Sequence, residues 1–170
     1  MIELLDQLKT SMSKETARSL AASSIQSQEV LEAIVLAAVE GKSPKDQKAA
    51  WVLWAISESN AAVLKPYASR ILTAIPKKDK SGTPRDMFKA VSQVKDLTED
   101  ELGLALDIAF KNLENTKTAI AEKHSGIGFI RQQLKAFPEL TEELIQLLYL
   151  QKELGTDPFK RYVNKTIQQL

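Results

Sequence analysis

The sequence predicts an all-α protein built from paired helices. Apolar residues recur at three- and four-residue steps along most of the chain, which is the spacing of one face of a helix. A small polar residue followed by proline opens several segments, because the polar side chain can cap a helix and proline is tolerated at its first position. These starts are Ser43-Pro44, Thr83-Pro84 and Asp157-Pro158. We find no convincing strand pattern.

Length and composition are those of one globular domain. The chain has 170 residues, enough for a substantial core, with 44% hydrophobic and 26% charged residues. It contains no cysteine, which excludes disulfides and cysteine-bound metals. The net charge of +1 argues against a general nucleic-acid binder but allows a local basic patch.

The sequence contains no recognisable targeting or membrane segment. The N-terminal stretch MIELLDQLKT mixes acidic residues with leucines and does not have the apolar core of a signal peptide. No apolar run approaches the roughly 20 residues needed to span a bilayer. A cytoplasmic protein is therefore expected.

Residues 43–75 contain the clearest pair of helices. Ser43 is expected to cap the first helix, which is apolar over most of its circumference and therefore buried between neighbours. The polar run 57–60 is expected to end it, with Asn60 as the cap of the second helix. The second helix has a one-sided apolar stripe, in which Pro66 should cause a kink or mark the first turn.

Caps and breakers place the remaining helices. Ser13, Ser27 and Thr141 are expected N-caps, and Thr98 with Glu101 three residues later forms a capping box. The helices expected outside the central pair cover 2–8, 14–22, 29–40, 83–95, 98–113, 116–137, 142–154 and 157–170.

Two glycines interrupt the long helical pattern over 116–137. Gly126 and Gly128 each lower helix stability by about 1 kcal/mol relative to alanine in an exposed helix. Glycine is tolerated most easily where another helix comes close. We therefore expect tight helix–helix packing here, or alternatively a close-approach surface for a partner.

The helix starts recur with a period near 40 residues. Ser43-Pro44 and Thr83-Pro84 are 40 residues apart, and the 74-residue interval to Asp157-Pro158 contains a degenerate start at Thr116. Two helices per unit at this period are typical of a HEAT-like solenoid, in which stacked units bury a common core. We predict a right-handed α-α superhelix with a concave side, formed by a single domain over 1–170. Residues 1–42 would be an N-terminal cap or a further repeat, and 43–170 the repeats proper.

Five segments occur in order along residues 40–170: KAAWVLWAISESN, LKPYASRILTAI, TPRDMFKAV, LKAFPELTEELIQLL and GTDPFKRYVNKTI. Together they resemble the HEAT-like repeat proteins related to the DNA-alkylation-repair glycosylases. The resemblance implies the superhelical repeat fold. For the alkylpurine glycosylases of that group it also implies excision of alkylated purines by aromatic, acidic and basic side chains in a concave groove. That constellation has no residue-by-residue match in this sequence.

The two tryptophans of the chain, Trp51 and Trp54, lie three residues apart in one apolar helix. Core packing is the favoured interpretation of the pair, with Trp51 buried. Trp54 is the one expected to reach a groove, and it is therefore a candidate binding residue.

Charges are distributed unevenly along the sequence. Eight basic residues lie between 65 and 95 against two acidic ones, and the following segment, 96–114, is acidic. One interpretation is a phosphate-binding patch, and the favoured one is exposed charges that pair across adjacent repeats. Arginine suits an anionic ligand best, because its forked guanidinium matches carboxylate and phosphate. The candidate binding residues are Arg70, Lys77, Lys78, Arg85 and Lys89, with Arg131 on the glycine-containing helix.

His124 is the single histidine, so it has no second histidine or cysteine with which to bind a metal. Glu122 lies on a different helical face, and a structural or surface role is therefore expected for His124. The sequence has no P-loop, dinucleotide-binding, nucleophile-elbow or metal-binding helix motif. We predict no catalytic residue, metal or cofactor.

The sequence thus predicts a non-enzymatic helical-repeat scaffold that binds a protein or peptide partner on its concave face and is a monomer. The alternative is a DNA-binding protein related to alkylation-damage DNA glycosylases, which rests on the resemblance and on the basic segment. Any enzymatic activity would then be of the alkylpurine glycosylase type.

Overall fold

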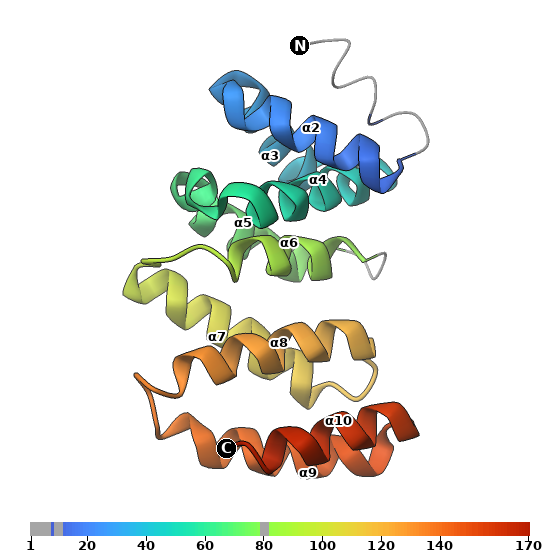
Figure 1. The fold of residues 1–170 in the computed structure, drawn as a ribbon, viewed down its shortest axis with the longest axis vertical. Coiled ribbons are helices and arrows are strands. Elements are labelled where there is room, and N and C mark those ends of the chain that lie inside the picture. The colour runs from blue at the N-terminus through green and yellow to red at the C-terminus, as the bar shows by residue number, and fades with distance from the viewer. Residues whose placement is uncertain (1–7, 9–11, 79–81) are drawn as a thin grey trace. The chain divides into compact units, whose positions relative to one another are not determined.

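The regular secondary structure is helical, as the sequence predicts (Figure 1). The computed structural model describes residues 8, 12–78 and 82–170, and no strand occurs among them. The predicted helix over 2–8 lies outside these residues except for Leu8, which is buried. Within the same part of the chain, no helix combines the length and the apolar character needed to cross a membrane.

The helices belong to two compact units, Met1–Leu104 and Ala105–Leu170. The first unit contains α2 (Lys14–Gln26), α3 (Gln28–Glu40), α4 (Lys45–Asn60), the 3-10 helix η2 (Ala61–Tyr67), α5 (Ala68–Ala74), the 3-10 helix η3 (Ile75–Lys77) and α6 (Thr83–Val91). The second contains α8 (Ile120–Gln133), α9 (Leu140–Leu154) and α10 (Asp157–Ile167). The boundary between the units falls within α7 (Glu99–Glu114).

Helix α4 is the centre of the first unit. It packs against α2 and α6, and on another side against α3, which in turn contacts α5 (Figure 1). Its residues Val52, Leu53 and Ile56 are fully buried as a result. Contact on several sides explains why the sequence of this helix is apolar over most of its circumference.

The core of the second unit includes apolar residues at helical spacing on α8, α9 and α10. Among them are Ile127, Ile130, Leu144, Leu148, Phe159 and Val163, all buried. This pattern is the one-sided apolar stripe expected of helices that cover a common core.

Two of the predicted N-caps are confirmed. Ser13 Oγ accepts a hydrogen bond from the backbone N–H of Thr16 over 3.0 Å at the start of α2. Ser27 Oγ accepts one from Val30 N–H over 3.4 Å at the start of α3. Each bond satisfies a backbone donor that has no partner within its helix.

The capping box at the start of α7 is also confirmed. Thr98 N–H donates to Glu101 Oε2 over 2.8 Å, and Glu101 N–H donates to Thr98 Oγ1 over 3.3 Å. The same carboxylate accepts a hydrogen bond from Lys65 Nζ over 2.6 Å, so that it connects η2 to the first turn of α7. Both contacts lower the pKa of Glu101, with the Lys65 hydrogen bond as the larger cause.

In none of the three proline-containing starts does the predicted polar residue occupy the cap position. Helix α10 begins at Asp157 itself, with Thr156 as its cap residue. Helix α4 begins at Lys45 with Pro44 in the cap position, so Ser43 does not cap it. Helix α6 begins at Thr83, but its cap residue is Gly82 and the Thr83 side chain is buried. Gly82 has a φ of 91°, which glycine adopts at no steric cost. A turn conformation therefore replaces the hydroxyl cap that the Thr-Pro pair suggested.

Two further cap predictions are wrong. Helix α4 runs to Asn60 and η2 follows directly, without a side-chain cap from Asn60. Helix α9 begins at Leu140, one residue before the predicted cap Thr141. Pro66 lies within η2, and α5 begins two residues later, so Pro66 is not in the first turn of that α-helix.

The segment predicted as one helix over 116–137 contains the shorter α8. Gly126 lies close to α7 in this helix, because a Cβ atom at position 126 would be 3.1 Å from the carbonyl oxygen of Ala109. A Cβ atom at Gly128 would have no neighbour within 4 Å. The expected close approach of a second helix is therefore found at Gly126 and not at Gly128.

Candidate functional site

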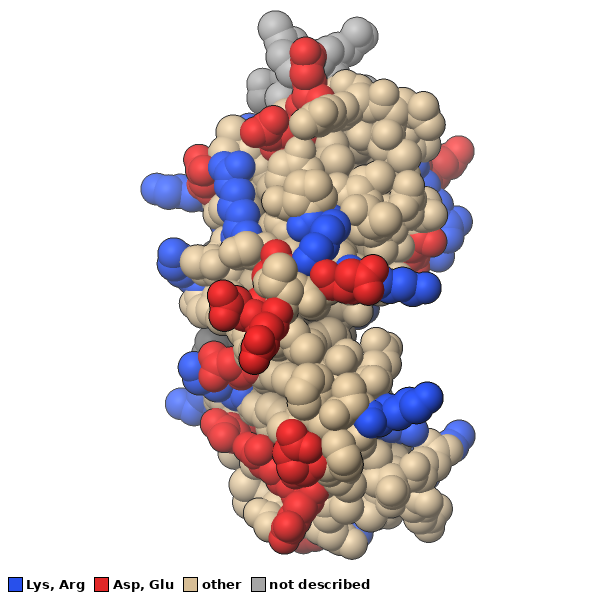
Figure 2. All heavy atoms as spheres, turned by 90° about the vertical axis from the view of Figure 1, so that its left-hand side faces the viewer, with Lys and Arg blue, Asp and Glu red and all other residues tan. Residues whose placement is uncertain are grey.

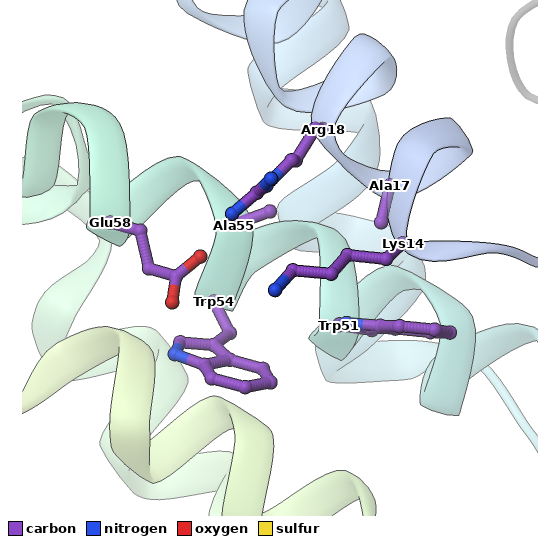
Figure 3. Close-up of a pocket in the computed structure, with 7 residues that line it drawn as sticks. All are labelled: Lys14, Ala17, Arg18, Trp51, Trp54, Ala55 and Glu58. Carbon is purple, nitrogen blue, oxygen red and sulfur yellow. The ribbon is translucent and has the colours of Figure 1, made fainter.

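A pocket between α2 and α4 contains both tryptophans of the chain (Figure 3). Its volume is about 180 Å³. We call it the tryptophan pocket, and it is lined by Lys14, Ala17, Arg18, Trp51, Trp54, Ala55 and Glu58. It combines aromatic surface with two basic side chains and one acidic side chain.

Helical spacing brings these side chains together. Trp51, Trp54 and Glu58 follow one another at steps of three and four residues, which places them on one side of α4. Lys14 and Arg18 are four residues apart and share a face of α2. In Figure 3 the two basic side chains extend from α2 toward α4, and the Glu58 carboxylate points into the same space.

Two alanines are also among the lining residues. Ala17 on α2 is fully buried and Ala55 on α4 is 5% exposed. The lining thus combines small buried side chains with longer charged and aromatic ones.

The prediction that Trp51 is buried in the core is wrong. Both Trp51 and Trp54 are half-buried, whereas Val52, Leu53 and Ile56 fill the core side of the same helix. Trp54 lines a pocket, as expected of the tryptophan that reaches a groove, but Trp51 lines the same one. The tryptophans lie on the less buried side of α4. The sequence did not indicate this, because apolar residues surround both of them in the chain.

Lys89 on α6, a third helix, contacts Trp54 but is not among the residues that line the tryptophan pocket. Its Nζ lies 4.2 Å from the centre of the Trp54 ring, within the range of a cation–π interaction. Such a contact contributes about 0.5–1 kcal/mol at exposed sites. Trp54 is thus held between α4 and α6 with one ring face near a positive charge.

The charges at the tryptophan pocket are not neutralised within the described residues. Neither Lys14, Arg18 nor Glu58 forms an ion pair or a side-chain hydrogen bond with another residue that the structure describes. Lys89 has the tryptophan ring as its side-chain contact. These groups are therefore available to a ligand.

Four of the eight basic residues counted between 65 and 95 form ion pairs with carboxylates. Arg70 Nη2 lies 2.7 Å from Glu40 Oε1, and Lys78 Nζ lies 3.5 Å from Asp46 Oδ2. Lys78 also donates to the carbonyl oxygen of Gly41 over 2.9 Å. On the face drawn in Figure 2, basic and acidic side chains are interspersed. The count of charges along the sequence missed these partners because they lie 30 or more residues earlier in the chain.

The other predicted binding residues lie apart from the tryptophan pocket lining. Arg85 Nε is 2.8 Å from the carboxylate of its neighbour Asp86, and Lys77 is exposed on η3. Arg131, in the second unit, donates to Gln169 Oε1 over 3.0 Å. Lys80, counted in the basic segment, lies outside the described residues. Of the predicted set, the structure brings Trp54 and Lys89 together.

Sequence reasoning missed Lys14, Arg18 and Glu58. Lys14 and Arg18 precede the tryptophans by more than 30 residues, so no local spacing connects them with α4. Glu58 could have been found from its four-residue step after Trp54, which places a carboxylate one turn from an indole. It was assigned instead to the polar end of the helix.

His124 belongs to an aromatic cluster in the second unit. Its ring stacks on Tyr162 with centroids 3.9 Å apart and planes at 16°, and Phe159 lies 5.6 Å away. Burial lowers the pKa of His124, because the charged imidazolium loses hydration. This packing agrees with the structural role expected from the sequence.

A buried lysine lies beside this cluster. Lys123 is 5% exposed, donates to Gln151 Oε1 over 2.6 Å and reaches the Thr116 carbonyl oxygen at 3.4 Å. Burial lowers the pKa of Lys123. Both acceptors are neutral oxygens, and Thr116 follows the end of α7, where carbonyl groups favour a cation. We assign Lys123 to the stability of the second unit.

The described residues contain no group of three or more histidine, aspartate or glutamate side chains arranged to hold a metal ion. Comparisons of the chain with family models, curated proteins and solved structures found no match. The resemblance to alkylation-repair relatives therefore remains a prediction from the sequence segments alone.

Proposed function

We propose that the chain is a non-enzymatic helical-repeat scaffold that binds a protein or peptide partner at the tryptophan pocket. The observation that carries the proposal is the exposure of part of two neighbouring tryptophans beside unpaired basic side chains. Tryptophan and arginine are the residues most enriched among those that dominate the binding energy of interfaces. Burying the rest of these large apolar rings would stabilise the fold further. Because part of each ring is left exposed, we take the pair as a surface that a partner covers.

The repeat character of the fold supports the same function. In the first unit, α4 packs between α2 and α6 and also against α3. Helices packed mainly on their neighbours in this way are what stacked HEAT-like repeats produce. We infer that these helices are repeats of a right-handed superhelix, whose extended surfaces commonly bind other chains.

Affinity capture from a lysate of the cells that produce the protein tests this function. Trp54→Ala should lose the captured partner, because an interface tryptophan typically contributes at least about 2 kcal/mol. Tyr149→Ala is the matched control, since Tyr149 is an exposed aromatic residue on α9 outside the pocket. Circular dichroism of both variants shows whether they fold. Equal capture by the wild type and a folded Trp54→Ala variant would contradict the assignment.

A DNA-binding protein related to alkylation-damage glycosylases is the second candidate. It is favoured by one observation, the presence of tryptophans, a carboxylate and an arginine around a single pocket. These are the residue types that the sequence resemblance implies for base excision. In such a reaction Glu58 would stabilise the positive charge that develops on the sugar, while the indole rings would shelter the extruded base.

Duplex DNA with and without an alkylated base distinguishes this candidate from the first. Binding should fall steeply with salt, because each phosphate contact releases counterions. Glu58→Gln should then abolish release of the free base while leaving duplex binding in place. If the wild type does not bind duplex DNA even at low salt, the second candidate is removed and the scaffold function stands.

A further inference from the structure

The charge at the tryptophan pocket is predominantly positive. Lys14 and Arg18 line it from α2, while Glu58 is the acidic residue in its lining. Elsewhere in the first unit, basic side chains such as Arg70 and Lys78 lie beside carboxylates. Lys14 and Arg18, by contrast, form no ion pair with any residue that the structure describes.

Folding does not explain the positions of Lys14 and Arg18. Lys14 is the first residue of α2, where the positive end of the helix dipole disfavours a cation by about 0.3–1 kcal/mol. Arg18 follows at the four-residue step, at which like charges on a helix repel each other. An anionic group bound nearby would turn both unfavourable placements into favourable ones.

The size of the tryptophan pocket limits what can enter it. A cavity of about 150 Å³ lined by apolar side chains is large enough to hold benzene. At about 180 Å³, the tryptophan pocket has room for one aromatic or large aliphatic side chain. The indole rings would cover the apolar part of such a group, and the cations would face the residues on either side of it.

We propose that the partner of this protein is an acidic peptide segment that inserts one large apolar side chain into the tryptophan pocket. Glutamate or aspartate residues flanking that side chain would pair with Lys14 and Arg18. Glu58 would accept a backbone N–H of the segment. This inference rests on the proposed scaffold function and specifies the chemistry of its partner.

The same observations favour a peptide over a nucleic acid. A phosphate backbone needs a row of unpaired basic residues along its path, but Arg70, Lys78 and Arg85 are each paired with a carboxylate. The net charge of the whole chain is only +1, which also argues against binding to a nucleic acid.

The two tryptophans make the pocket directly observable, because they are the only ones in the chain. The probes are four blocked hexapeptides without tryptophan: Glu-Glu-Phe-Leu-Glu-Glu, its glutamine and lysine counterparts, and Glu-Glu-Ala-Ala-Glu-Glu. A thymidine oligonucleotide is the fifth probe. Each is titrated into the full chain at low salt while tryptophan fluorescence is recorded.

We expect the acidic phenylalanine-leucine peptide to change the fluorescence with a Kd in or below the millimolar range, about −4 kcal/mol or better. The glutamine peptide and the alanine peptide should each bind about tenfold more weakly or not at all. Raising the salt concentration should weaken the acidic peptide selectively, since the pairs it forms are exposed to solvent.

Matched charge variants complete the test. Lys14→Gln with Arg18→Gln should weaken the acidic peptide about tenfold and leave the glutamine peptide unaffected. Lys117→Gln with Lys135→Gln removes the same charge from exposed residues of the second unit and should have no effect. An equal loss in both double variants would show that net charge alone is responsible, and would overturn the proposed contacts.

The possible failures are distinguishable. If the glutamine or lysine peptide binds as well as the acidic one, the acidic preference is wrong while peptide binding at the pocket stands. If the oligonucleotide changes the fluorescence and no peptide does, both the acidic segment and the scaffold function are contradicted. If no probe has an effect up to millimolar concentration while Trp54→Ala still loses the captured partner, the acidic segment alone is contradicted.

Discussion

The ammonium group of Lys123 donates a hydrogen bond to the side-chain oxygen of Gln151 over 2.6 Å inside the second unit. Both residues are almost fully buried, and the Gln151 amide nitrogen lies 3.5 Å from the Glu114 carbonyl oxygen. The pair thus links α8 and α9 to the end of α7. A charged group inside a protein is tolerated only if its donors find acceptors, so each partner depends on the other.

We expect strong coupling between these two residues. Gln151→Leu should lower the free energy of unfolding by about 2–3 kcal/mol, because it leaves the buried ammonium group without its main acceptor. Lys123→Met should lower it by about 1–2 kcal/mol, since a buried oxygen loses its donor. The double variant should lose less than the sum of the two. Urea unfolding of all four proteins measures the coupling, and strictly additive losses would contradict it.

The Glu101 carboxylate should make stability depend on acidic pH. Its pKa is lowered in the folded chain, first by Lys65 and then by Thr98, so the carboxylate stabilises the fold above its ordinary pKa of about 4.3. This stabilisation should disappear as the pH falls from about 4.3 through the lower folded value. Glu101→Gln should therefore be less stable than the wild type at neutral pH, with the difference shrinking in acid. A constant difference across urea titrations from neutral to acidic pH would sink this explanation.

The ion pairs of Lys78 and Arg70 offer a comparison between a buried and an exposed contact. The side chains of Lys78 and Asp46 are 8% and 4% exposed, whereas those of Arg70 and Glu40 are 39% and 63% exposed. Lys78→Met should cost about 3 kcal/mol, because it leaves a buried carboxylate without its cation. Arg70→Met should change stability by no more than about 0.5 kcal/mol. Similar losses for both variants, measured by urea unfolding, would contradict the role of burial.

The two glycines of α8 should respond differently to alanine. Gly128→Ala should stabilise the protein by up to about 1 kcal/mol, because the new methyl group meets no neighbour within 4 Å and alanine favours the helix. Gly126→Ala should lose this gain, since its methyl group would press on the backbone of Ala109 at 3.1 Å. Thermal unfolding of the two variants tests the difference. A Gly126→Ala variant as stable as Gly128→Ala would show that α7 moves away easily.

The helical class and several helix starts follow from local chemistry and could be predicted from the sequence. The confirmed caps join residues only three positions apart, so the residue types and their spacing are enough to predict the hydrogen bonds. These are the caps of Ser13 and Ser27 and the capping box of Thr98 and Glu101. Starts that depend on backbone turns were missed. At Gly82 the chain adopts a positive φ, and the polar side chain of the following threonine turns inward.

The candidate site was less predictable because it depends on contacts between distant segments. Trp54 and Lys89 were both identified, but for different reasons and without the contact between them. Lys14 and Arg18 lie near the tryptophans only because α2 packs beside α4 in the fold. Conversely, the basic segment looked uncompensated because Glu40 and Asp46 precede it in the sequence and meet it only in the fold.

The contact between Gly126 and Ala109 also limits how the sequence can diverge. A side chain at 126 would meet backbone atoms of α7, which cannot turn aside as the end of a flexible side chain can. Relatives that retain this helix pair should therefore keep glycine at 126, while position 128 should vary freely. Different rates of substitution at two glycines only two residues apart would then show which face of α8 is fixed by contact with α7.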